Sequence, residues 1–295
     1  MDINAANLSY LFKGYSLAFK GALESAQNAS LYTRIARVVP SSGESNTYPS
    51  LGNMPKMREW IGPRVVKQLD AFDYRLVNKK YEDTVEVPRE KIEDDQYAMF
   101  GDEVAELGRA CGELPGDAIF SALRDGSAAG SLCYDNQPFF SASHPVGEST
   151  ETNWAGGSGD LWVLLDTSRR IKPMIWQERI KPMITPRMRE SDDNVFWEDK
   201  YIVGARARGV AGYGLWQCAY GSKQTLDSSS FNAALAQMGS LKNDEGADLG
   251  IKPNLLLVNY ANRAAAEAVL NAQFLANGAS NINYKAVDLL VTNQL

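Results

Sequence analysis

The residue types that most often carry catalysis are scarce in this chain. Its single histidine, His144, lies in the segment SHPVG, and Cys133 precedes it by eleven residues. A histidine close to a cysteine can activate the thiol as a nucleophile, so a Cys/His hydrolase is one interpretation. The alternative is a histidine that only packs in a turn, since Gly and Ser flank the segment. We favour the packing histidine.

Metal and nucleotide sites have little support in the sequence. The acidic runs IEDD (92–95) and ESDDN (190–194) could recruit magnesium through paired carboxylates, but a helix cap and a solvated loop also account for them. The spacing of cysteine and histidine fits no zinc site. Phosphate loops, dinucleotide fingerprints and nucleophile elbows are missing, and the glycine-rich GVAGYG (209–214) matches none of them. We therefore predict no catalytic residue, no cofactor and no metal.

Composition indicates an ordinary globular protein of 295 residues, 44% hydrophobic and 22% charged, with a net charge of −6. An acidic balance argues against a dedicated nucleic-acid binder, which would carry a basic stripe. Its three cysteines are far apart, which favours free thiols in a reducing compartment. No apolar run approaches the ~20 residues of a membrane span. The sequence thus predicts a soluble protein made in the cytoplasm, with no membrane partner.

The N-terminal third predicts elements that lack support of their own. Residues 1–48 are rich in Ala, Ser and Asn, and the spacing of Leu8, Leu11, Tyr15 and Phe19 predicts one short helix. Such an arm buries little surface, so we expect it to be mobile or to lie on a neighbour. Residues 57–92 read as a long charged hairpin, with extended chain from Tyr74 to Pro88. Such a hairpin is marginal in isolation, so the rest of the subunit or another subunit must support it.

The strongest helix signal follows this hairpin. Apolar residues from Tyr97 to Cys111 repeat at spacings of three and four, and the pattern continues beyond Pro115 up to Gly126. Pro115 either kinks one long helix or begins a second one.

Strands are predicted over 161–222, where the pentapeptide RIKPM occurs at 170–174 and again at 179–183. We interpret the two copies as successive sheet elements. The last 70 or so residues predict a compact α/β unit: a helix over 231–241, a strand at 255–258, an alanine-rich helix ending at Gly278 and a closing strand. Tryptophans such as Trp162, Trp176, Trp197 and Trp216 are interpreted as core or interface residues.

Six segments resemble the family of Mu-like phage major head subunits. These segments are SNTYPSLGNMPKMREWIG (45–62), NKKYEDTVEVPREKIEDDQ (78–96), CYDNQPFFSASHP (133–145), LLDTSRRIKPMIWQERIKP (164–182), GYGLWQ (212–217) and GIKPNLLLV (250–258). The resemblance runs along nearly the whole chain and implies an α+β fold, the tailed-phage major capsid fold. In that fold we expect an N-terminal arm (1–48), an extended β-hairpin loop (49–92), a peripheral domain (93–222) and an α/β axial domain (223–295). The peripheral domain would combine a spine helix, about 93–125, with a β-sheet.

The function implied by the resemblance is self-assembly into pentamers and hexamers of an icosahedral head around double-stranded DNA. Partners would be copies of the chain, a separate scaffolding protein, a portal protein, decoration proteins and, non-specifically, the packaged DNA. Such a protein would be found in the virion, and in the host cytoplasm during assembly. Alternatives are a tail-tube or decoration subunit, and the Cys/His hydrolase.

Contacts between subunits are expected from the arm, the extended loop and the predicted sheet. Arg206 and Arg208 alternate with small residues, as do Arg187 and Arg189, so each pair projects from one sheet face. They would line either an inner DNA-facing patch or a row of inter-subunit ion pairs, and we favour the ion pairs. The candidates for inter-subunit contact are Tyr15, Trp60, Arg64, Lys67, Tyr74, Arg75, Lys79, Lys80, Arg206 and Arg208.

Overall fold

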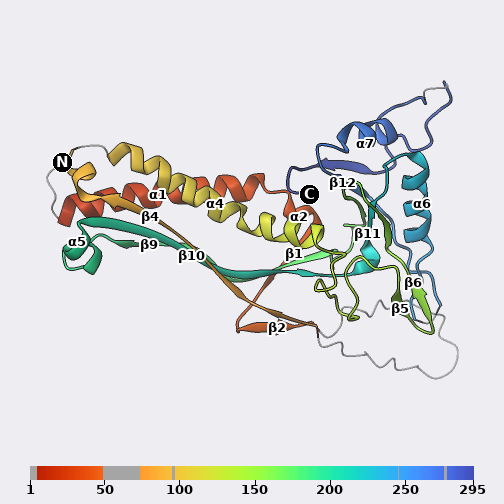
Figure 1. Ribbon diagram of the computed structural model, residues 1–295, viewed down its shortest axis with the longest axis horizontal. Coiled ribbons are helices and arrows are strands. Elements are labelled where there is room, and N and C mark those ends of the chain that lie inside the picture. The colour runs from red at the N-terminus through yellow and green to blue at the C-terminus, as the bar shows by residue number, and fades with distance from the viewer. Residues whose placement is uncertain (1–4, 49–73, 95–96, 245, 276–277) are drawn as a thin grey trace.

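A computed structural model describes residues 5–48, 74–94, 97–244, 246–275 and 278–295. The body is elongated (Figure 1). One end consists of two long helices lying on a long sheet, and the other consists of a second sheet with two shorter helices. The α+β class predicted from the sequence is confirmed.

The elements are as follows. Helices are α1 (Ala5–Ala29), α2 (Tyr32–Ile35), α3 (Arg89–Glu93), α4 (Tyr97–Arg124), α5 (Asp193–Glu198), α6 (Ser228–Gly239) and α7 (Arg263–Leu270), with a 3-10 turn η1 (Trp216–Cys218). Strands are β1 (Ala36–Pro40), β2 (Ser45–Thr47), β3 (Arg75–Val77), β4 (Lys79–Pro88), β5 (His144–Val146), β6 (Ser149–Glu151), β7 (Trp154–Gly157), β8 (Trp162–Leu165), β9 (Met174–Arg187), β10 (Lys200–Tyr213), β11 (Ala219–Lys223), β12 (Leu255–Val258) and β13 (Asp288–Val291).

The long sheet has the strand order β1-β9-β10-β4, and α4 packs on one of its faces. Alternate residues of β10, Tyr201, Val203 and Ala205, point into this layer and are buried. They form a core with apolar residues of α4, among them Val104 and Leu107. The long helix predicted over about 93–125 is present as α4, and Pro115 lies inside this single helix.

The N-terminal helix is longer than the short one expected, and it is supported within its own chain. Helix α1 spans 25 residues and packs along α4 of the same chain. Glycines make the approach close: a Cβ added at Gly108 would lie 2.3 Å from the backbone oxygen of Phe19, and one at Gly112 would lie 2.7 Å from Ala26 Cβ. Because these glycines lie four apart on one face of α4, the two helix backbones can meet there. Tyr15 and Phe19 are buried as a result.

The charged segment 74–88 is supported by the rest of the subunit, one of the two sources expected, but it does not fold back on itself as a hairpin. Strand β4 pairs antiparallel with β10 along its whole length, from Lys79 opposite Gly209 to Pro88 opposite Lys200. Strand β3 pairs with β2 instead. Residues 49–73 of the expected extended loop lie outside the described residues.

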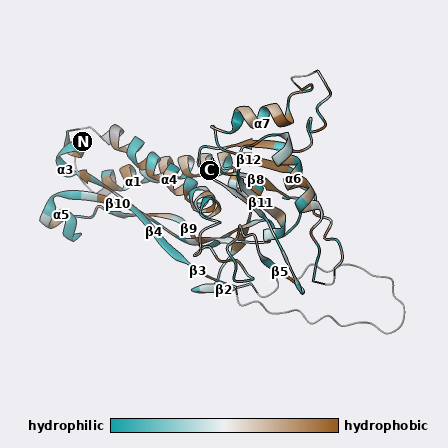
Figure 2. Ribbon diagram, turned by 45° about the vertical axis from the view of Figure 1, so that its right-hand side comes forward, coloured by the Kyte–Doolittle hydropathy of each residue, from teal (hydrophilic) through white to brown (hydrophobic). Residues whose placement is uncertain are grey.

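The second sheet has the order β13-β12-β8-β11-β7 and forms most of the larger core with Trp162, Leu256 and Phe231 of α6. Its strands come from both sides of the boundary predicted at 222/223. The strands expected to form one sheet over 126–222 therefore divide among three sheets, because β9 and β10 belong to the long one and β5 and β6 pair only with each other. The sheets also differ in hydropathy: in Figure 2 the five-stranded sheet is largely hydrophobic, while β4 of the long sheet is hydrophilic.

Two local predictions also need correction. The helix expected to end at Gly278 ends at Leu270, since Asn281 donates its side-chain amide to the carbonyls of Val269 and Ala272. The two RIKPM copies are not two strands: the second lies in the middle of β9. There Pro182 coincides with a register shift opposite β10, a position that tolerates the missing N–H.

Among the helices formed by the described residues, none has the length and apolarity that crossing a bilayer requires.

Candidate functional site

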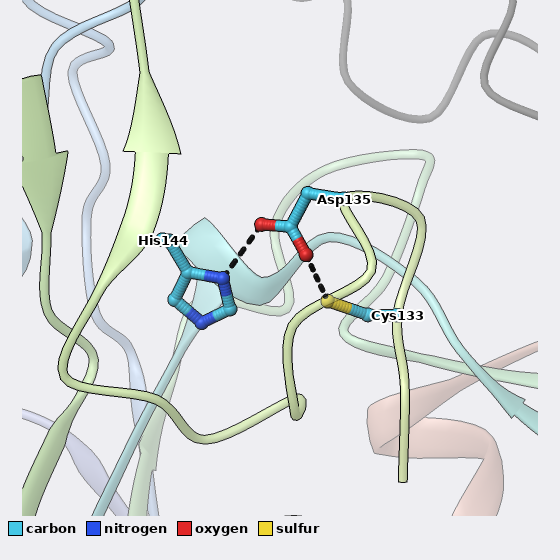
Figure 3. Close-up of side chains that lie close together, drawn as sticks. All are labelled: Cys133, Asp135 and His144. Carbon is cyan, nitrogen blue, oxygen red and sulfur yellow. Dashed lines mark hydrogen bonds and ion pairs between the residues drawn. The ribbon is translucent and has the colours of Figure 1, made fainter. Parts of the chain in front are cut away.

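The structure brings three potentially reactive side chains together, Cys133, Asp135 and His144 (Figure 3). Asp135 lies between the other two: His144 Nδ1 is 2.7 Å from its Oδ2, and the Cys133 thiol donates to its Oδ1 at 2.9 Å. The side chains of His144 and Asp135 are 0% and 3% exposed. Cys133 and Asp135 belong to one turn after α4, and His144 begins β5.

The amide of Asn153 fixes the protons on the histidine ring. Its nitrogen donates to the carbonyls of Phe139 and Trp216, and its oxygen accepts the N–H of Ser141. That oxygen also lies 3.1 Å from His144 Nε2, so Nε2 must donate. On the other side, an ionised Asp135 can only accept, so Nδ1 must donate as well. Both ring nitrogens therefore face acceptors, which is the hydrogen-bonding pattern of an imidazolium paired with a carboxylate.

One further contact and the pKa of Asp135 favour a charged ring. The ring stacks on the indole of Trp216, with centroids 4.0 Å apart and planes 6° from parallel, and an aromatic face attracts a cation. Although burial acts to raise it, hydrogen bonds from His144 and Cys133 hold the pKa of Asp135 below its usual value. The carboxylate therefore stays ionised opposite the ring.

The distances fit a proton between these groups better than a metal ion. Tetrahedral zinc would hold a nitrogen and an oxygen ligand roughly 3.3 Å apart, and a sulfur and an oxygen ligand about 3.5 Å apart. The observed separations are 2.7 Å for His144 to Asp135 and 2.9 Å for Cys133 to Asp135. A 2.7 Å contact is typical of a charge-assisted N–H···O bond.

The geometry also argues against the Cys/His hydrolase. The Cys133 thiol donates to Asp135 rather than to His144, so the histidine is not placed to remove its proton. Burial, first, and then the charge of Asp135 raise the pKa of Cys133 well above its usual value. The cluster joins the turn after α4 to β5 and η1, and it stabilises that junction.

The predicted contact residues are scattered. Tyr15 lies in the core of its own subunit, only 3% exposed, so its contacts in this chain are intramolecular. Tyr74 is half-buried and its hydroxyl accepts the N–H of Tyr213, while the exposed Arg75 donates to Ser45 Oγ. Three other candidates, Trp60, Arg64 and Lys67, lie outside the described residues.

Three of the remaining four candidates, Lys80, Arg206 and Arg208, share one face of the long sheet, where β4 pairs with β10. Lys79 begins β4 and, as the residue next to Lys80, lies on the opposite face. Lys80 lies opposite Arg208 in the register, and Glu82 lies opposite Arg206. Lys79, Lys80 and Arg206 are exposed, and Arg208 is half-buried. The predicted projection of both arginines from one face is confirmed by this register, and their role between subunits remains a prediction.

One exposed pair of aromatics was only partly recognised in the sequence, where Trp197 was interpreted as a core or interface residue and Phe196 was not considered. Phe196 and Trp197 of α5 are 70% and 78% exposed and contact each other edge to face, 4.8 Å between centroids. Trp162, Trp176 and Trp216 are all buried. The signal in the sequence was two adjacent aromatics inside the acidic run DDNVFWED.

Comparison with known proteins identifies the family. Residues 8–295 match the family model described as Mu-like prophage major head subunit gpT. The chain is 37% identical over 294 residues to the major capsid protein of Escherichia phage Mu, covering 96% of this chain and 95% of that protein. It is also 37% identical to the Mu-like prophage FluMu major head subunit of Haemophilus influenzae, covering 90% of this chain and 89% of that one.

Solved structures agree. A chain of the procapsid of bacteriophage JBD30 matches with a TM-score of 0.86 and 42% identity, covering 99% of this chain and 100% of that chain. A chain of the JBD30 capsid matches with a TM-score of 0.80 and 33% identity, covering 90% of each. Sequence, architecture and both comparisons agree that the chain belongs to the Mu-like major head subunit family and is the major capsid protein of a Mu-like phage virion.

Proposed function

We propose that this major capsid protein assembles, as pentamers and hexamers, into the icosahedral head that encloses double-stranded DNA. The observation that carries the proposal is the match along essentially the full length to a procapsid subunit, with a TM-score of 0.86. Self-association needs heterologous contacts that close into rings, and one sequence then occupies slightly different angles in five- and six-membered rings.

Within that shell we assign domains by sheet rather than by the predicted boundaries. The peripheral domain is α1, α4 and the long sheet, and the axial domain is the five-stranded sheet with α6 and α7. One observation supports the division: the boundary at 222/223 would separate β12 from β8, the strand with which it pairs. Lys79, Lys80, Arg206 and Arg208 would then contact other subunits from the peripheral domain.

Partners beyond copies of the chain follow from the same function. A closed head that is filled with DNA needs a scaffolding protein during assembly and a portal through which the DNA enters. The JBD30 capsid is decorated with minor capsid protein trimers, and we extend such decoration to this shell. Assembly would take place in the host cytoplasm. A net charge of −6 supports only non-specific contact with the packaged DNA.

Electron microscopy with light scattering tests the proposal on the full chain expressed together with its scaffolding protein. We expect closed shells of uniform diameter, or five- and six-membered rings. Monomers and dimers alone, with the scaffolding protein present, would contradict shell assembly. Tubes of constant diameter would instead favour the tail-tube alternative.

A further inference from the structure

Helix α5 forms an exposed aromatic tip at one end of the elongated body. It connects β9 to β10, and Figures 1 and 2 place it at the same end as the start of α1. Phe196 and Trp197 project there with most of their surface in solvent. The helix also carries Asp193 and Glu198 and no basic residue. Its surface is therefore apolar with an acidic rim.

The outer face of α1 carries the opposite pattern. Tyr10 and Leu17 are large apolar side chains, yet they are 76% and 72% exposed. The opposite side of α1 is buried against α4. Lys13 and Lys20 lie on this outer face as well, with Lys13 Nζ 5.5 Å from the centre of the Tyr10 ring. Residues 10, 13, 17 and 20 recur at helical spacing, so they form one stripe. From Tyr10 to Lys20 the stripe is apolar and basic, and the exposed Glu24 follows it at the same spacing.

We propose that α5 of one subunit docks on the α1 stripe of a second copy of this chain. Phe196 and Trp197 would pack on Tyr10 and Leu17, while the carboxylates of α5 approach the two lysines. Complementary charge around an apolar centre is the usual arrangement of a specific interface. A second copy is the partner because its α1 provides both halves of that pattern, and the proposal rests on the shell assembly proposed above.

The position of both surfaces restricts the geometry of the contact. It is heterologous, since α5 meets α1 and not another α5. Both surfaces lie at one end of an elongated body, so copies joined this way point their other ends away from the contact. Where the rotation from one copy to the next closes, as shell assembly requires, these contacts form a ring of tips rather than a filament. The ring would link subunits through their α1 ends, away from the five-stranded sheets.

A charge-swap experiment on the full chain, expressed with its scaffolding protein, tests the pairing. One variant reverses the stripe (Lys13→Glu with Lys20→Glu), a second reverses the tip (Asp193→Lys with Glu198→Lys), and a third combines all four. We expect each reversal to lower the yield of shells at least tenfold and the combination to restore it. Ser25→Glu, which adds a negative charge to the exposed surface of α1 beside the stripe rather than on it, is the control and should assemble normally.

Trp197→Ala measures the apolar half of the contact. A buried aromatic at an interface centre commonly contributes enough that its loss weakens binding about 30-fold or more, so we expect the subunit concentration needed for assembly to rise by that order. Variants that assemble like wild type would overturn the proposal and would indicate that α5 contacts a different protein. Folded single reversals that fail without rescue by the combination would also overturn it. Failure of the wild-type chain itself would count against shell assembly instead.

Discussion

Replacing His144 should destabilise the subunit far more than replacing its partner Asp135. His144→Ala leaves the Asp135 carboxylate buried and without its cation, a loss that typically amounts to about 3–5 kcal/mol. It also removes the ring stacked on Trp216. Asp135→Asn is different, since the introduced amide can donate to Nδ1 of a neutral ring and its oxygen can still accept from Cys133. We expect that change to reduce the free energy of unfolding by only about 1 kcal/mol.

Urea unfolding of the unassembled subunit measures both changes, provided the slope with urea is the same in all variants. NMR supplies an independent reading of the protons, because the chain contains a single histidine. With ¹⁵N-labelled histidine, the wild type should show two ring N–H groups near pH 7, and Asp135→Asn should show one. One N–H in the wild type, or equal destabilisation by both substitutions, would refute the assignment of an imidazolium.

Acid provides a further test of the same pair. The pKa of Asp135 is lowered in the folded state, so its stabilising contribution is present above its unfolded value of about 3.9 and is lost as pH falls through the folded value. The wild type should therefore lose stability below about pH 4. The difference in free energy of unfolding between wild type and Asp135→Asn should shrink over that window, and a constant difference would argue against an ionised Asp135.

Three further outcomes follow from the structure. Gly108→Ala should destabilise the subunit by about 1–3 kcal/mol, because the added Cβ meets the α1 backbone. Gly101→Ala, where a Cβ would meet open space, should stabilise it by up to about 1 kcal/mol. Urea unfolding of both variants tests this difference in sign. Burial raises the pKa of Cys133 and raises that of Cys218 to about 12. A thiol reagent at pH 8 should therefore label these two cysteines only after unfolding, while the half-buried Cys111 reacts earlier. Equal labelling of all three in the native protein would contradict this expectation. A strong chelator should leave the melting temperature unchanged, and a decrease would indicate a metal at the Cys133 cluster.

Local apolar patterns in the sequence predicted individual helices and strands. The spacing from Tyr97 to Cys111 identified α4, and LLLV identified β12 as a buried strand. What the sequence did not show is which distant segment each element meets. Strand β4 was expected to be unsupported because its partner β10 begins more than a hundred residues later. The length of α1 was missed for the same reason, although Gly108 and Gly112 carried a small-residue spacing that indicates close helix packing.

The candidate site was only half visible in the sequence. Cys133 and His144 attracted attention by residue type, and the favoured interpretation of His144 as a packing residue agrees with its burial. The deciding groups were Asp135, which separates the two, and Asn153, whose orientation depends on backbone carbonyls from distant loops. No spacing rule encodes the direction of an amide, so the protonation of the ring required the structure.

The pairing of β4 with β10 also has a consequence for synthesis. Between Pro88 and Lys200 lie 111 residues, which a ribosome that adds about 5–20 residues per second completes on the order of ten seconds later. Throughout that interval β4 has no partner strand, and nascent chains on neighbouring ribosomes present the same free edge. Charged residues along an unpaired strand oppose edge-to-edge aggregation, and β4 carries Lys79, Lys80, Glu82, Asp83 and Glu86. Its charges therefore protect each new chain until its own β10 has been made.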